Sequence, residues 1–85
     1  MALDILYFAW VRERIGTGAE RVELPVEVRD VRGLLVWLAG RSDGHAAALA
    51  EPERLRAAID DRFVSLDAEL EGAREVALFP PVTGG

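Results

Sequence analysis

The pattern of apolar and polar positions divides the chain into short strands around one amphipathic helix. Residues 3–8 are apolar at nearly every position after Asp4, which is typical of a strand buried inside a sheet. Residues 20–24 alternate between polar and apolar, as in a half-exposed strand, and Pro25 ends that pattern. The alternation predicts that the second strand pairs with the first as a hairpin.

The amphipathic helix is predicted to begin after Asp30, a favourable N-cap residue. Apolar residues then recur at helical spacing and line one face, and Gly40 is placed to end the helix. These apolar residues are Val31, Leu34, Leu35 and Leu38. A helix with one apolar stripe must lie on an apolar surface, and the sheet is the candidate.

Two segments carry weaker patterns. Residues 9–15 are mixed, which predicts a loop with a short helical turn at most. Residues 42–45 predict a loop with His45 at the surface. Residues 46–58 predict either short helices or an irregular excursion around Pro52.

A hairpin and a helical turn are predicted in the third quarter of the chain. Asp60 and Asp61 are suited to a tight turn between two strands. They could also be read as an acid–base pair, but neighbouring turn residues seldom converge on a substrate, so the turn role is favoured. Leu66 and Leu70 predict a helical turn that packs into the core.

The last predicted strand covers residues 75–79 and is as uniformly apolar as the first, until Pro80 and Pro81 remove two successive ladder donors. Central, parallel neighbours have this pattern. The order therefore predicts an α+β fold of the β-grasp (ubiquitin-like) kind, a mixed sheet with the first and last strands as parallel neighbours and one main helix packed across it. Residues 1–81 would form this domain, and residues 82–85 a flexible C-terminal Gly-Gly tail.

Composition excludes several kinds of site. The 85 residues suffice for one domain and contain no cysteine, so disulfides, thiolate zinc sites and cysteine nucleophiles are excluded. His45, the single histidine, cannot build a multi-histidine metal site, and no metal site is predicted.

Charge and hydropathy bear on partners and location. The net charge is −5 and all ten cations are arginines, a balance that argues against nucleic acid and suits a basic protein partner. No apolar run approaches the ~20 residues that span a bilayer, and no secretory signal is recognisable at the start. We therefore expect a cytoplasmic protein with no membrane partner.

The C-terminal residues offer the clearest chemistry. From Pro80 to Gly85 the chain can extend at most about 20 Å, which is long enough to enter a partner's active site. Gly84 and Gly85 lack Cβ atoms and fit a narrow channel. The delivered group would be the terminal carboxylate, which needs activation, for example as an acyl-adenylate made from ATP. Attack by sulfur would then leave a thiocarboxylate at Gly85.

Both ends of the chain carry a family resemblance. Residues 74–85, which end in Phe-Pro-Pro-Val-Thr-Gly-Gly, resemble the end of the MoaD-type sulfur carriers, the small subunits of molybdopterin synthase. Residues 5–9, followed by Arg12, Glu13 and Gly16, are similar to the start of that family. The likeness covers essentially the whole chain. The turn before the last strand is one residue longer than the family pattern and lacks its aspartate.

The resemblance implies that Gly85 is adenylated by an E1-like enzyme, which uses ATP, and is then converted to a thiocarboxylate. The tail would enter the large synthase subunit, within a heterotetramer, and donate sulfur for the molybdopterin dithiolene. The groups that act on the pterin would belong to the large subunit, and this chain would bind no cofactor. The partner-binding residues would be Phe79, Pro80, Pro81, Val82, Thr83 and Gly84.

Other functions and placements stay open at this point. The alternatives are a sulfur carrier for thiamine or cysteine synthesis, a ubiquitin-like protein modifier, and a plain binding module. Phe79 is equally suited to the core and to the exit of the tail, whereas Trp10 and Trp37 suit partial core packing better than a docking face. An apolar interface is expected on the sheet near the tail, but the pattern does not say which residues form it.

Overall fold

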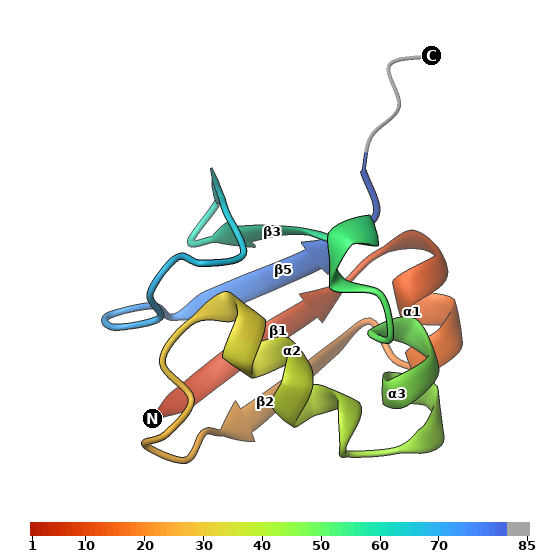
Figure 1. Ribbon diagram of the computed structural model, residues 1–85, viewed down its shortest axis with the longest axis horizontal. Helices are drawn as coiled ribbons and strands as arrows, with labels where there is room; N and C mark the ends of the chain where they lie inside the picture. Colours follow the sequence, from red (N-terminus) through yellow and green to blue (C-terminus); the bar gives the residue numbers. More distant parts are fainter. Residues whose placement is uncertain (82–85) are drawn as a thin grey trace.

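Five strands form one mixed sheet in the computed structural model, which describes residues 1–81 (Figure 1). The strands are β1 (Ala2–Tyr7), β2 (Ala19–Glu23), β3 (Arg56–Ile59), β4 (Arg62–Val64) and β5 (Glu75–Phe79). Their order is β2-β1-β5-β3-β4, with β1 and β5 parallel and the other pairs antiparallel. The β-grasp prediction, with the first and last strands as parallel neighbours, is confirmed.

Helices cover one face of the sheet, and Figure 1 shows α2 lying across it. The helical segments are α1 (Ala9–Ile15), α2 (Val31–Ala39), α3 (Asp43–Ala48) and the 3₁₀ helix η1 (Pro52–Arg54). The helix α2 forms as predicted, because the Asp30 carboxylate accepts a hydrogen bond from the Gly33 N–H at 2.7 Å. All four residues of its predicted apolar stripe are buried.

The core lies between these helices and the inward positions of the central strands. Leu3, Ile5 and Tyr7 of β1 and Val76 and Leu78 of β5 are almost fully buried. The alternate residues of β1 and β5 are only half-buried, because among residues 1–81 no helix covers the outer face of the sheet. The first strand lies inside the sheet as predicted, but its outward positions are less buried than its apolar pattern suggests.

The prediction of a loop at residues 9–15 is wrong, since this segment forms the helix α1. Val11 is fully buried and Trp10 and Ile15 pack partly against the core, so tertiary contacts stabilise a helix that the local pattern does not favour. Gly16 ends the helix with a left-handed backbone (φ 95°), and its N–H donates to the Arg12 carbonyl.

Residues 42–45 do not form a loop but begin the helix α3, and His45 is buried rather than at the surface. The Ser42 hydroxyl accepts a hydrogen bond from the His45 backbone N–H and so caps the helix. The alternative of short helices is correct for part of residues 46–58, which hold the end of α3, then η1 and then β3.

The turns around β4 are partly as predicted. Asp60 and Asp61 form the hairpin turn with positive φ angles, and the Asp60 carboxylate accepts hydrogen bonds from the backbone N–H groups of Arg74 and Glu75. This pair therefore has a structural role. Residues 65–70 form no helix. The Ala68 N–H donates to the Ser65 carbonyl in a turn, Glu69 forms an isolated bridge with Asp30, the N-cap of α2, and Leu70 is buried as expected.

Candidate functional site

The C-terminal tail begins at the end of the central strand β5. Figure 1 shows the chain leaving the sheet there, beside η1. Phe79 lies opposite Arg56 of β3, and the Leu78 carbonyl accepts a hydrogen bond from the Phe8 N–H at 3.2 Å. Pairing of β5 with β1 and β3 therefore fixes the backbone up to Phe79. After it, Pro80 is half-buried and Pro81 is exposed.

Four of the seven predicted site residues lie outside the residues that the structure describes. They are Val82, Thr83, Gly84 and Gly85. Of the other three, Phe79 settles an alternative that the sequence left open. It is half-buried on the outer face of the sheet and does not belong to the fully buried core.

Apolar side chains gather beside the base of the tail on this outer face. They come from β1, β3, β4 and β5 and from the residue that follows β1. We call them the apolar patch: Leu6, Phe8, Ala58, Phe63, Ala77 and Phe79. The pairing register places them together, since Ala77 lies opposite both Leu6 and Ala58, and Ala58 lies opposite Phe63.

Two phenylalanine rings form the most prominent part of the apolar patch. The ring centroids of Phe63 and Phe79 are 5.6 Å apart with the planes inclined by 45°. Phe63 is 83% exposed and Phe8 is 47% exposed. Grouped exposed aromatic side chains are typical of a surface that a partner covers. The apolar patch is therefore the candidate for the interface expected near the tail.

A polar cluster inside the fold was missed by the sequence analysis. The Glu20 carboxylate accepts hydrogen bonds at 2.6 Å from the Tyr7 hydroxyl and at 2.6 Å from His45 Nε2. Arg41 Nη2 lies 3.4 Å from its other oxygen, and Ser42 Oγ lies 2.6 Å from His45 Nδ1. These bonds attach α3 to the edge of the sheet. Period-two alternation with Val22 and Leu24 was the signal that Glu20 faces inward.

The electrostatics of this cluster keep Glu20 ionised. Burial, the largest single effect, raises the pKa of Glu20, but the hydrogen bonds from Tyr7 and His45 and the nearby charges of His45 and Arg41 together hold that pKa below its ordinary value. Burial and the hydrogen bond to Glu20 raise the pKa of Tyr7 strongly, so its hydroxyl stays a donor. At neutral pH the cluster therefore holds α3 against the edge of the sheet.

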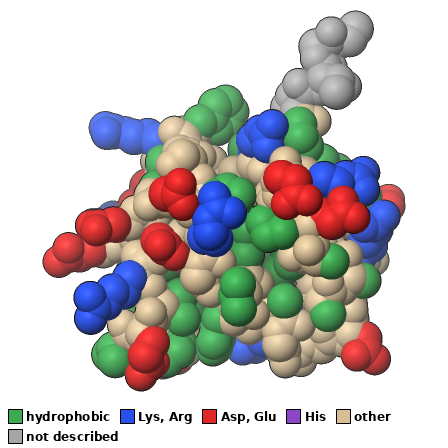
Figure 2. Space-filling model, in the orientation of Figure 1, with side chains coloured by type: hydrophobic (Ala, Val, Ile, Leu, Met, Phe, Trp, Pro, Cys, Tyr) green, Lys and Arg blue, Asp and Glu red, His purple; other side chains and the backbone are tan. Residues whose placement is uncertain are grey.

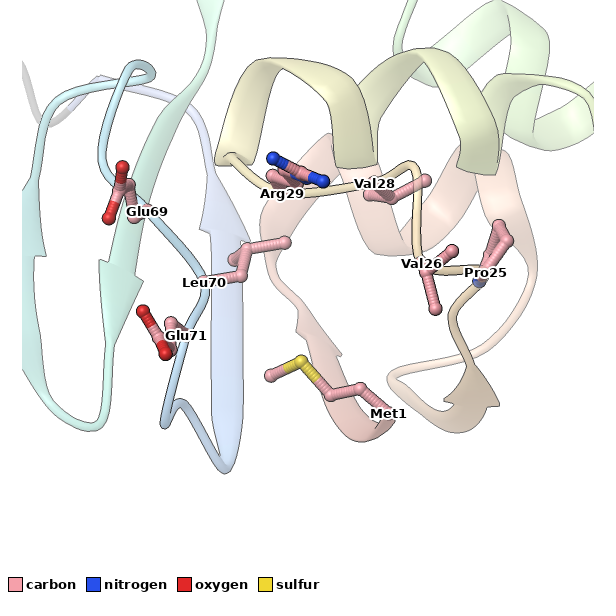
Figure 3. Close-up of a pocket in the computed structure, with 8 residues that line it drawn as sticks. All are labelled: Met1, Pro25, Val26, Val28, Arg29, Glu69, Leu70 and Glu71. Atoms are coloured by element: carbon pink, nitrogen blue, oxygen red, sulfur yellow. The ribbon is translucent and has the colours of Figure 1, made fainter.

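A cavity of about 430 Å³ lies far from the tail. Residues 25, 26, 28 and 29 line one side and residues 69–71 line the other, and the side chains of Met1 and Leu70 point into the gap (Figure 3). The cavity lies beside the start of β1. Because β1 and β5 are parallel and the tail follows the end of β5, the cavity and the tail are at opposite ends of the sheet.

Residues 1–81 offer neither a metal-binding cluster nor a membrane-spanning helix. No group of three or more histidine, aspartate or glutamate side chains in this part of the chain is arranged to hold a metal ion. No helix there has the length and apolar character needed to cross a membrane.

Comparisons with known proteins agree in the family that they indicate. The model of the ThiS family matches residues 5–85. The molybdopterin synthase sulfur carrier subunit of Escherichia coli (strain K12) is 43% identical over 83 residues, which cover 98% of this chain and 99% of that protein.

Two solved structures share the fold. SAMP1 from Haloferax volcanii superposes with a TM-score of 0.73 at 24% identity, covering 100% of both chains. A complex of subunits 1 and 2 of the molybdopterin-converting factor from Helicobacter pylori 26695 contains a chain that superposes with a TM-score of 0.63 at 21% identity, again over 100% of both chains.

Proposed function

The chain belongs to the ThiS family, and on that premise we propose that it is a sulfur carrier subunit of molybdopterin synthase, with the sulfur held at Gly85. The relative that is 43% identical over nearly its full length bears this function in its name. The C-terminal Phe-Pro-Pro-Val-Thr-Gly-Gly supports the same assignment. We assign residues 1–81 to the folded body and residues 82–85 to the segment that is delivered.

The observation that carries the proposal is the position of the tail's base. The chain leaves the sheet from its central strand, next to an exposed apolar patch, through two consecutive prolines. Hydrogen bonds to β1 and β3 fix the direction of β5 up to Phe79, and Pro80 and Pro81 restrict the backbone after it. A tail with such a base can be aimed into a partner once the apolar patch has docked.

The chemistry at Gly85 would proceed in two steps. The terminal carboxylate attacks the α-phosphorus of ATP in the active site of an E1-like adenylating enzyme, and pyrophosphate leaves. A sulfur nucleophile at the oxidation level of hydrosulfide then attacks the acyl carbon, AMP leaves, and a thiocarboxylate remains. The chain has no cysteine, so it cannot carry the sulfur as a persulfide. These steps use ATP, which we take to place the protein in the cytoplasm.

The apolar patch is our proposed docking surface for the large synthase subunit. It lies beside the base of the tail, so one partner can cover Phe63 and Phe79 and receive Gly85 at the same time. The complex of two molybdopterin-converting factor subunits contains a chain of this fold, which supports a two-subunit assembly. Stable interfaces are rich in buried aromatic residues, as this patch would be.

Mass spectrometry of the intact chain after co-expression with a sulfuration system tests the proposal. A carrier gains one sulfur in place of one oxygen at Gly85, a protein modifier becomes attached to target lysines, and a plain binding module shows neither change. A second assay measures dithiolene formation when the sulfurated chain is mixed with the large subunit and the pterin precursor. A sulfurated chain that is inactive there would instead support a carrier for thiamine or cysteine synthesis.

A further inference from the structure

A second surface beside the tail combines one tryptophan with two arginines. The guanidinium carbon of Arg14, in α1, lies 4.6 Å from the ring centroid of Trp10, and that of Arg54, in η1, lies 5.7 Å from it. Trp10 is half-buried, whereas both arginines are exposed. A shallow hollow at this point is lined further by Ala47, Ala48, Ala50 and Glu51. We call it the arginine hollow.

The arginine hollow carries a local positive charge on an acidic protein. Its one carboxylate, Glu51, lies 3.6 Å from Arg54, and Arg14 forms no ion pair with any side chain of residues 1–81. The chain as a whole has a net charge of −5. Guanidinium groups stay protonated, and stacking on an indole leaves their N–H edges available to carboxylates.

The arginine hollow and the apolar patch flank the base of the tail on different sides. The helix α1 follows the end of β1, and η1 precedes the start of β3, which pairs with the end of β5. Figure 1 shows α1 and η1 at the end of the sheet where the chain leaves it. Figure 2, drawn from the helix side, shows basic and acidic side chains next to one another near that point. The apolar patch lies on the opposite, outer face.

We propose that the arginine hollow docks an acidic segment of the enzyme that adenylates Gly85. This inference rests on the proposed function. A carrier must present one tail to two partners. It binds the large synthase subunit stably, and it binds the adenylating enzyme only until the carboxyl group of Gly85 is activated. An apolar patch suits the stable complex, whereas charged groups on exposed side chains speed encounter and still allow release. The acidic surface elsewhere makes a nucleic acid an unsuitable occupant.

The arginine hollow acts on docking and not on the chemical step, because the reacting carboxyl group is at the far end of the tail. Reversing its charge should therefore raise the KM of the adenylating enzyme for the carrier and leave kcat unchanged. The effect should also shrink as salt is added, since exposed charges are screened within a distance of about 10 Å at 0.1 M salt.

The experiment uses the full chain with the double substitution Arg14→Glu and Arg54→Glu. Its matched control is Arg21→Glu with Arg32→Glu, which changes the net charge equally. Both control arginines lie in exposed ion pairs on β2 and α2, away from the hollow. Melting curves by circular dichroism establish that each variant is folded. Pyrophosphate release with ATP and the adenylating enzyme gives KM and kcat, and a titration gives the Kd for the large subunit.

We expect the hollow variant to raise KM roughly tenfold at low salt, with kcat and the Kd for the large subunit within about twofold of wild type. The control variant should change KM by less than about threefold. An unchanged KM in the hollow variant, an equal rise in the control, or an equal loss of large-subunit binding would each overturn the inference. Absence of pyrophosphate release with the wild-type chain would instead contradict the proposed function.

Discussion

Replacing Glu20 by glutamine removes one charge from the polar cluster while keeping the shape of the side chain. The carboxylate accepts two hydrogen bonds at 2.6 Å, from Tyr7 and His45, and lies 3.4 Å from Arg41. These bonds join β1, β2 and the start of α3, which are separated along the chain by up to 38 residues, from Tyr7 to His45. The substitution therefore tests whether the cluster stabilises the fold.

The magnitude follows from the hydrogen bonds. A bond to a charged group contributes about 1.5–3 kcal/mol and a neutral one about 0.5–1.5 kcal/mol, so two weakened bonds cost about 2 kcal/mol. The glutamine amide would also place an N–H donor against the Arg41 guanidinium, which has only donors and no acceptor atom. For a domain of this size, 1 kcal/mol shifts Tm by roughly 4–8 °C, so we expect Tm to fall by roughly 8–16 °C.

The effect should depend on pH with a definite sign. The folded state holds the pKa of Glu20 below its ordinary value of 4.5. The carboxylate therefore contributes its full stability at neutral pH, and that contribution is lost as the pH falls through the lowered pKa. Glutamine does not titrate. The difference in the free energy of unfolding between wild type and Glu20→Gln should thus shrink in acid.

Urea titrations and thermal melts at several pH values measure these quantities. The matched control is Glu23→Gln on the same strand, because the Glu23 side chain is 77% exposed and, within residues 1–81, forms an ion pair with the N-terminal amine alone, at 3.4 Å. We expect the control to change stability by less than about 0.5 kcal/mol. A Glu20→Gln variant with the same Tm as the control would refute the reasoning that the cluster stabilises the fold.

Three further predictions concern the last strand and the tail. Leu78→Asp should unfold the domain, since Leu78 is fully buried and an unpaired buried charge costs several kcal/mol of the roughly 5–15 kcal/mol that domains have; a variant with wild-type melting by circular dichroism would contradict the assigned core. Deleting Gly85 should abolish sulfur transfer in a product assay without changing the melting curve, and retained transfer would rule out the carrier mechanism. Gly84→Val should slow single-turnover sulfur transfer about 100-fold while binding to the large subunit persists, because a branched side chain misplaces the neighbouring acyl carbon; normal transfer would argue against a narrow channel.

The sequence alone determined the elements whose signals are local. The helix α2 has its capping aspartate and its apolar stripe within nine consecutive positions, and β5 has an apolar run closed by two prolines. The proposal of a thiocarboxylate at Gly85 also starts from the residues themselves, a C-terminal glycine pair in a chain without cysteine. Each of these conclusions depends on neighbours in the chain, so no knowledge of the tertiary structure was needed.

Only the tertiary structure decided which distant residues meet. Phe63 and Phe79 are 16 positions apart and touch because β3 pairs with both β4 and β5. His45 is buried because Glu20, 25 positions earlier in the chain, supplies a hydrogen-bond partner from outside the six-residue helix α3. A register shift of one residue would turn Glu20, Phe63 and Phe79 to the other face of the sheet, and which strands become neighbours is decided only when the sheet forms.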